Sequence, residues 1–364
     1  MGFDGPLGGK LADMERVVIT GVDTPLGRRV ARRVAQDPGA RVVGLAGGPV
    51  VDLPSEVEVR RIELRHDDVK PLLEQTAAVI HLATSVPDSP TAPTDDVATA
   101  RRVLDAAGDA GVHHLVVLSS ATVYGAWANN PVPLTEDAPL RPNAGFAFAA
   151  ERAEIERLTA EWRADHPGTT AAVLRPARVA GAADHDWLVR ALRPAAAVPE
   201  TADEPPVQFV DLDDVAAAVD VARRRRLDGA FNVAPEGSIP GDELRSLVGV
   251  PPKVPLPERI ASRVLRWGFR WGLGPTPPEL APYTLHPWVV AADRLRGEGW
   301  TPTASNEEAC VEAHEAGPWA TLSPRRRQEI ALGVAGVGLV GLVVGVTVLV
   351  RRLVRRAAAR PPAA

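Results

Sequence analysis

The chain has 364 residues, 45% of them hydrophobic, which is enough apolar material for one large α/β core or for two smaller ones. Its net charge of -5 and isoelectric point near 6.0 exclude the strongly basic surface of a nucleic-acid-binding protein, so we expect no nucleic-acid partner. The single cysteine, Cys310, excludes a disulfide framework and fits a reducing compartment.

The first predicted unit is a strand, a glycine turn and a helix within residues 17–34. Residues 17–20 are all β-branched and uncharged, as in a buried strand, and apolar side chains then recur at the helical period. Gly21 and Gly27 flank the turn, and Pro25 suits the first helical turn, where a missing N–H costs nothing. Such a turn lets the backbone approach a pyrophosphate at a helix N-terminus, as in dinucleotide-binding folds. Thr24 replaces a middle glycine, so the motif alone leaves an ordinary strand-to-helix turn open.

Strands and helices continue to alternate along the chain, which predicts an α/β fold with a Rossmann-like, doubly wound parallel sheet. The strand at residues 41–45 ends at Ala46, Gly47 and Gly48. NAD-binding versions of this fold carry an acidic residue there for the adenosine ribose, and NADP-binding versions place an arginine nearby. Neither is present, so NAD and NADP both stay open as the cofactor. Further strands are expected at residues 57–64, 77–83 and 114–119, and helices at residues 69–75 and 95–111.

Seven stretches carry a family resemblance. The most specific are LSSATVYG at residues 118–125 and PLTEDAPLRP at residues 133–142. In these stretches and their order the chain resembles the extended short-chain dehydrogenase/reductases, in particular the NAD-dependent epimerase/dehydratase family that acts on nucleotide sugars. The resemblance covers residues 16 to about 235 and implies the same fold. The other stretches are residues 20–27, 79–83, 174–176, 207–215 and 231–233.

The resemblance also implies roles for individual residues. Ser120 aligns with the catalytic serine of the family, which hydrogen-bonds the reacting hydroxyl or carbonyl. Glu63 stands where an acid that contacts adenine is usual, and residues 81–83 pass under the nicotinamide side. The cofactor-binding residues implied are Gly21, Thr24, Pro25, Leu26, Gly27, Glu63, Leu64, His81, Leu82, Ala83 and Arg152.

The chain departs from the family at its proton-transfer pair. The family uses a tyrosine with a lysine four residues later, which places both side chains on one helical face. The two tyrosines and three lysines of this chain never occur at that spacing. Matching the AEIERL end of the corresponding helix puts Phe148 at the tyrosine position and Arg152 at the lysine position; another register gives Phe146 and Ala150. Phenylalanine carries no ionisable proton, whereas arginine still binds ribose hydroxyls.

Other departures concern the substrate. Arg178 replaces an asparagine that helps the family to grip a nucleotide diphosphate, Ala180 replaces a frequent aromatic residue, and Asp211 replaces a common histidine. Tyr124 is a weaker candidate for a substitute base, because active members carry a tyrosine there beside the catalytic one. Residues 184–186, Asp-His-Asp, are interpreted as a solvated turn, and no metal site is expected.

Residues 14–235 are expected to form the NAD(P)-binding domain, with insertions from about residue 180 that belong to the substrate lobe. Residues 236–318 are expected to form a smaller lobe rich in proline and tryptophan. Within it, residues 258–273 place arginines at helical intervals, with Ile260, Val264 and Trp267 one step further on. Such a helix suits a membrane interface and equally suits a lid packed on its own domain.

The C-terminal part predicts a membrane anchor. Residues 330–350 are 21 positions without a charge, long enough to cross a hydrocarbon core of ~30 Å. We therefore expect a linker at residues 319–329, a transmembrane helix at residues 330–350 and a basic tail at residues 351–364. The bilayer is then a partner, and the protein is located at the cell membrane by a single-pass C-terminal anchor.

Two further expectations concern the same segment. Gly341 and Gly345 form a G-x-x-x-G spacing that pairs membrane helices, so a homodimer is expected. The N-terminus carries no signal-peptide pattern, which places the main domain in the cytoplasm, although the tail is richer in arginine than the near side.

Two hypotheses of function follow. The first is a membrane-anchored NAD(P)-binding protein without standard Tyr/Lys catalysis, acting as a sensor or scaffold. The alternative is an active oxidoreductase or epimerase on a nucleotide-sugar or lipid-linked small-molecule substrate, with a non-standard proton relay.

Overall fold

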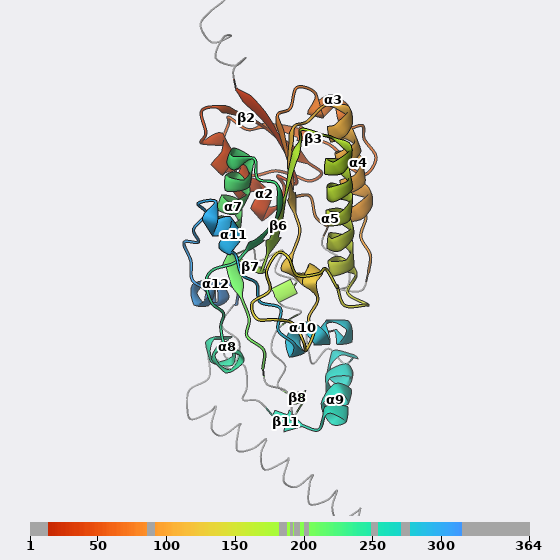
Figure 1. Cartoon of the computed structure of the whole chain (residues 1–364), viewed down its shortest axis with the longest axis vertical. Helices are drawn as coiled ribbons and strands as arrows, with labels where there is room; N and C mark the ends of the chain where they lie inside the picture. The colour runs from red at the N-terminus through yellow and green to blue at the C-terminus, as the bar shows by residue number, and fades with distance from the viewer. Residues whose placement is uncertain are drawn as a thin grey trace, which may run out of the picture.

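The computed structural model describes residues 14–85, 92–181, 188–189, 192, 197–199, 204–248, 254–270 and 277–314. A parallel sheet of seven strands, in the order β10-β6-β5-β4-β1-β2-β3, forms the centre of this part of the chain (Figure 1). The strands are β1 (Glu15–Thr20), β2 (Ala40–Ala46), β3 (Glu58–Arg61), β4 (Ala78–His81), β5 (His114–Leu118), β6 (Thr170–Pro176) and β10 (Gly229–Val233).

Helices cover both faces of the sheet, and strand residues alternate between the two cores. In β1, Val17 and Ile19 pack in the cluster that contains Val30 of α2, whereas Val18 packs in the cluster that contains Val103 of α4. Helices α2 (Pro25–Ala35) and α7 (Leu212–Arg225) lie on one face, and α3 (Lys70–Leu73), α4 (Asp96–Asp109) and α5 (Ala147–Asp165) lie on the other (Figure 1).

The order of the strands creates a crevice beyond the carboxyl ends of the neighbouring strands β1 and β4. The chain runs outward from β1 to β2 and β3 and then returns to β4 on the other side of β1. Ligands of doubly wound folds bind beyond the carboxyl ends of the strands at such a reversal. The predicted α/β sheet is confirmed, with strand bounds that differ from the predicted ones by a few residues.

Smaller elements lie between the strands of the main sheet and after its last strand. Residue Trp300 is fully buried in the main core, and its indole Nε1 donates to the carbonyl oxygen of Asp214, 3.0 Å away, so the chain near residue 300 packs back on α7. The smaller elements are η1 (Ala121–Tyr124), β7 (Arg178–Ala180) paired with β9 (Phe209–Asp211), β8 (Ala197–Pro199) paired with β11 (Val254–Leu256), α8 (Gly241–Val248), α9 (Glu258–Arg270), η2 (Pro278–Leu280), α10 (Ala281–Leu285), α11 (Asp293–Gly297) and α12 (Asn306–Ala313).

No helix within the described residues is both long enough and apolar enough to cross a bilayer. The predicted transmembrane segment at residues 330–350 lies outside the described residues, as do the predicted linker and basic tail.

Candidate functional site

The glycine turn after β1 is fixed by close backbone contacts. Gly21 has φ +75°, and a Cβ atom there would lie 2.9 Å from the backbone of Ala83. A Cβ atom on Gly27 would lie 2.0 Å from the carbonyl oxygen of Gly21. The Thr24 hydroxyl caps helix α2: it accepts from the N–H of Gly27 at 3.0 Å and donates to the carbonyl oxygen of Gly21 at 2.8 Å. Only glycine fits at these two positions, so the predicted turn forms and directs the N-terminus of α2 toward the crevice.

A buried hydroxyl holds β1 and β4 together beneath this turn. Thr20 Oγ1 accepts from the N–H groups of Leu82 and Ala83, at 3.1 and 3.2 Å, and lies 2.9 Å from Nδ1 of His81. Burial lowers the pKa of His81 to about 4, which favours its neutral ring. Because Thr20 Oγ1 already accepts two hydrogen bonds, its own hydroxyl hydrogen is donated to Nδ1 of His81. His81 therefore positions the strand ends, whereas Leu82 and Ala83 line the crevice itself.

The first of two adjoining cavities has a volume of about 220 Å³ and lies at the end of the crevice where the family resemblance implies that adenosine binds. Sequence reasoning placed Glu63 and Leu64 here, and both line the cavity. It missed Asp23, which reaches this cavity from the glycine turn because its carboxylate accepts from the N–H of Gly48 at 2.7 Å. The remaining lining residues are Gly21, Thr24, Leu45, Gly47, Ile62, Arg65, Ala83, Thr84, Ser85, Asp96 and Thr99.

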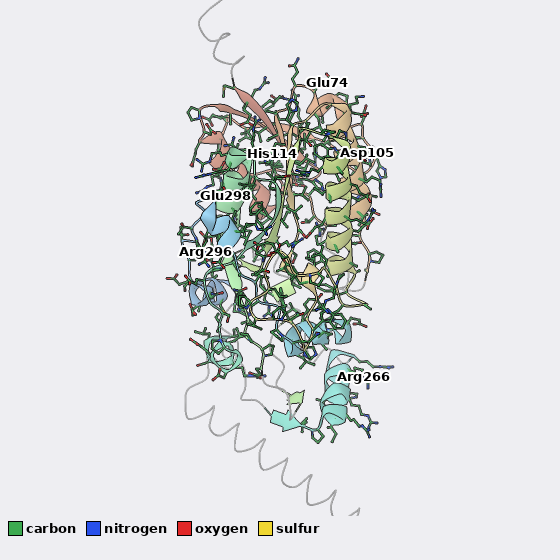
Figure 2. All side chains as sticks on the ribbon, in the orientation of Figure 1. Glu74, Asp105, His114, Arg266, Arg296 and Glu298 are labelled. Atoms are coloured by element: carbon green, nitrogen blue, oxygen red, sulfur yellow. The ribbon has the colours of Figure 1, made fainter. Side chains whose placement is uncertain are left out.

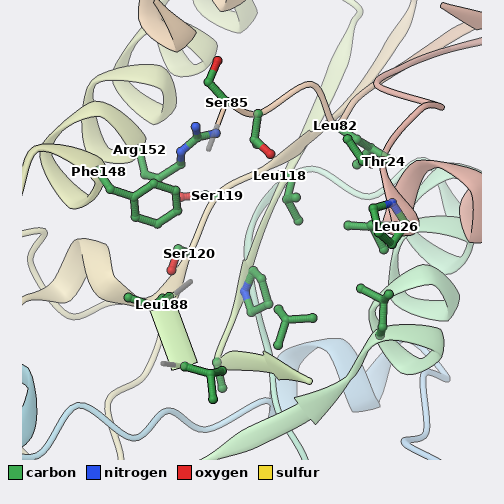
Figure 3. Close-up of a pocket in the computed structure, with 17 residues that line it drawn as sticks. Thr24, Leu26, Leu82, Ser85, Leu118, Ser119, Ser120, Phe148, Arg152 and Leu188 are labelled. Atoms are coloured by element: carbon green, nitrogen blue, oxygen red, sulfur yellow. The ribbon is translucent and has the colours of Figure 1, made fainter. Parts of the chain in front are cut away.

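The second cavity, of about 140 Å³, continues from the first, with which it shares Thr24, Thr84 and Ser85. Figure 3 shows Phe148, Arg152 and two serines on one wall and Leu26 on the opposite side. The described residues that line it are Thr24, Pro25, Leu26, Leu82, Thr84, Ser85, Leu118, Ser119, Ser120, Phe148, Arg152, Pro176, Ala177, Val179, Leu188, Val189 and Leu212.

Helix α5 presents the first of the two sequence registers to this cavity. Phe148 and Arg152 line the cavity, whereas Phe146 is fully buried, 5.1 Å from the ring of Tyr283, and Ala150 is exposed. The positions that carry the tyrosine and lysine in the resembled family are therefore occupied by phenylalanine and arginine at the cavity wall.

Arg152 is the cation of this site. It is 2% exposed and forms an ion pair with Asp96, whose carboxylate also accepts from the N–H of Ser85. Its guanidinium carbon lies 5.0 Å from the ring centre of Phe148. Its Nε atom has no hydrogen-bond partner among the described residues, which leaves one buried donor available for a ligand oxygen.

The Ser120 hydroxyl lies on the same wall and acts only as an acceptor in its hydrogen bonds to described residues. Its Oγ accepts from the backbone N–H and from the hydroxyl of Thr122, at 3.2 and 3.0 Å. The hydroxyl hydrogen of Ser120 is therefore available to a group in the cavity, as the role implied by the family resemblance requires.

Tyr124 lies in the interior and is not among the residues that line either described cavity. Its hydroxyl donates to Asn232 at 2.8 Å and accepts from Arg175 at 2.7 Å, and Arg175 pairs with Glu156 at 2.6 Å. Burial raises the pKa of Tyr124 to about 12. The geometry therefore favours Ser120 over Tyr124 as the hydroxyl that meets a ligand.

Arg178 also points into the interior. Its guanidinium lies between the rings of Phe209 and Trp288, at 5.6 and 5.1 Å, and donates to the carbonyl oxygen of Tyr283 at 3.3 Å. Burial lowers its pKa to about 10. Asp211, where the family often has histidine, caps helix α7 by accepting from two backbone N–H groups. Neither side chain lines the two described cavities.

The sheet, the glycine turn and the crevice beyond the strand ends define a protein with a Rossmann-like dinucleotide-binding fold. The chain belongs to the NAD-dependent epimerase/dehydratase family, whose model matches residues 17–234. A search of curated protein sequences finds no significant match.

Solved structures of this fold include several sugar epimerases. The chain is similar to UDP-glucose 4-epimerase of Thermotoga maritima with UDP-glucose: TM-score 0.61, 18% identity, 83% of this chain and 98% of that one covered. It is also similar to UDP-glucose 4-epimerase of Thermus thermophilus in complex with NAD, with TM-score 0.58, 20% identity and 82% and 97% of the two chains covered. A third is UDP-N-acetylglucosamine 4-epimerase of Methanobrevibacter ruminantium: TM-score 0.61, 18% identity, 83% and 97% covered. At these identities the likeness shows a shared fold.

The buried histidines predict a pH dependence of stability. Burial lowers the pKa of His81 and of His114 from 6.5 to about 4, so the unfolded chain binds more protons than the folded one in this window. The free energy of unfolding should fall as the pH drops from about 6.5 to 4, by up to about 1.4 kcal/mol per pH unit for each histidine. Urea denaturation at several pH values measures this slope.

A matched pair of variants assigns the slope to burial. His114→Gln should reduce it by about half, since one of the two groups is then removed. His113→Gln, at the exposed neighbouring position, should leave it unchanged. A wild-type stability that stays flat across this window would contradict the assignment.

Proposed function

We propose that this protein binds a nicotinamide dinucleotide in the crevice and does not perform the tyrosine-dependent proton transfer of its family, acting as a redox-cofactor sensor or scaffold. One observation carries the proposal: Phe148 and Arg152 occupy the wall where the proton-transfer pair belongs. Among the described lining residues of this cavity, none is an aspartate, glutamate, histidine, cysteine, lysine or tyrosine. A general base needs such a side chain within reach of the substrate.

The other residues fit the dinucleotide. Two positions of the turn exclude a Cβ atom, and the N-terminus of α2 faces the crevice, as a bound pyrophosphate requires. Arg152 would bind ribose hydroxyls through its free Nε–H, and Ser120 would donate to a polar group beside the nicotinamide. A bound nicotinamide supplies hydride chemistry; the chain itself supplies binding and orientation.

The alternative is an active oxidoreductase or epimerase, on a nucleotide-sugar or lipid-linked substrate, with a non-standard proton relay. It is supported by Ser119, whose hydroxyl lines the cavity and donates to the buried carboxylate of Glu156. This chain of hydroxyl and carboxylate connects the cavity to a titratable group. The same carboxylate is also held by the guanidinium of Arg175, at 2.6 Å.

We further propose that the protein is held at a membrane by its C-terminal segment, with helix α9 at the bilayer surface and the main domain on the cytoplasmic side. The proposal is supported by the uncharged segment at residues 330–350 and by the exposure of α9. Ile260, Val264 and Trp267 are 47%, 41% and 58% exposed and follow one helical stripe. Arginines form a neighbouring stripe, and Figure 2 shows Arg266 projecting outward from this helix.

Restoring the missing pair tests the catalytic part of the proposal. The double variant Phe148→Tyr/Arg152→Lys should gain NAD-dependent interconversion of UDP-glucose and UDP-galactose, about 100-fold or more above wild type, because it regains a base of tunable pKa. Initial rates of UDP-galactose formation and transient absorbance of reduced cofactor measure the gain.

The other helical register provides the control. Phe146→Tyr/Ala150→Lys adds the same residue types away from the cavity and should gain nothing. Turnover by the wild-type protein that the restored pair does not increase would contradict the proposal.

Spin labels test the membrane arrangement in the full chain, reconstituted in vesicles of phosphatidylcholine and phosphatidylglycerol. A label at Val264→Cys should become accessible to oxygen and shielded from a nickel complex, because it enters the apolar interface. A label at Val59→Cys, whose native side chain is 42% exposed at a strand edge, should stay aqueous. The native Cys310 is fully buried and should therefore not react with the label. Equal aqueous accessibility at both labels would refute the arrangement.

A further inference from the structure

The acidic group expected at the end of β2 is absent from the chain. The strand ends at Ala46, and Gly47 and Gly48 follow it. In this class of fold a carboxylate at that place accepts hydrogen bonds from the adenosine ribose. The three residues present offer only backbone groups there.

A carboxylate from another element occupies this place. Asp23 lies in the glycine turn between β1 and α2, and its Oδ2 accepts from the backbone N–H of Gly48 at 2.7 Å. A Cβ atom on Gly48 would lie 3.1 Å from the same oxygen, and one on Gly47 would lie 4.0 Å from it. The Asp23 carboxylate is therefore packed against the backbone just beyond β2, inside the adenosine-end cavity.

The neighbouring cations leave this carboxylate uncompensated. Arg65 lines the same cavity but pairs with Asp95 at 2.9 Å and lies 3.9 Å from Glu63. Arg28 donates to the backbone carbonyl of Asp23 at 2.7 Å. Among the described residues, no ion pair with the Asp23 carboxylate is formed, and Oδ1 keeps its capacity to accept hydrogen bonds.

We propose that Asp23 is the residue that reads the adenosine ribose and selects NAD over NADP. The inference rests on the proposed dinucleotide binding and supplies the specificity that the end of β2 does not. A carboxylate accepts from the 2′- and 3′-hydroxyls of NAD, whereas the 2′-phosphate of NADP would meet an uncompensated negative charge. The selecting group thus comes from the first turn of the fold instead of from its second strand.

Calorimetric titration of the full-length protein in detergent with NADH and with NADPH tests this assignment. Wild type should bind NADH at least about tenfold more tightly than NADPH. In Asp23→Asn the amide oxygen still accepts from Gly48, so the fold is kept while the charge is lost. This variant should bind NADH about tenfold more weakly and should lose most of the preference.

Asp105→Asn removes an exposed negative charge from α4, outside both cavities, and is the control, since it should leave both affinities unchanged. If wild type binds NADH and Asp23→Asn keeps the wild-type ratio of the NADH and NADPH affinities, the role of Asp23 is overturned while the proposed dinucleotide binding stands. Binding of neither cofactor by wild type would refute the proposed function and this inference with it.

Discussion

The close approach of three backbone segments governs this structure. Gly27 lies against Gly21, and Gly21 lies against Ala83 at the end of β4, with no space for a Cβ atom at either glycine. Because this contact joins the first turn to the returning strand, it sets the width of the crevice at the point where the strand order reverses. The Thr20 hydroxyl secures the same junction from below by accepting from two N–H groups.

The two ends of the crevice differ in chemistry. The adenosine end is polar, with backbone groups and the carboxylates of Asp23 and Glu63. The other end is largely apolar, and its charged lining residue, Arg152, is paired with Asp96 beneath the wall. An arginine keeps its charge at all working pH values, so the Arg152 side chain is suited to hold a ligand oxygen and is not suited to act as a proton acceptor. In the proposed function, the binding part of the site is kept while the proton-transfer pair is replaced.

Local features of the sequence predicted most of this arrangement. The glycine turn and the buried strands follow from neighbouring residues. The match to the family's helix left two registers open, and the residues of the first, Phe148 and Arg152, both line the second cavity. Long-range contacts escaped prediction: Asp23 meets Gly48 only because a loop folds back, and the burial of Tyr124 depends on Asn232, 108 residues away. Whether α9 packs as a lid was open from its pattern, since exposure is a tertiary property. The membrane anchor stays a prediction.

The central claim is that the crevice binds a dinucleotide without a titrating base. Calorimetric titration of the purified full-length protein with NADH, repeated between about pH 6 and 9, tests it most directly, since a catalytic base whose pKa is tuned to the working pH would titrate in this range. We expect one NADH per chain with an affinity that does not change across the range. Absence of binding, or an affinity that steps with pH as a group in the crevice titrates, would contradict the account.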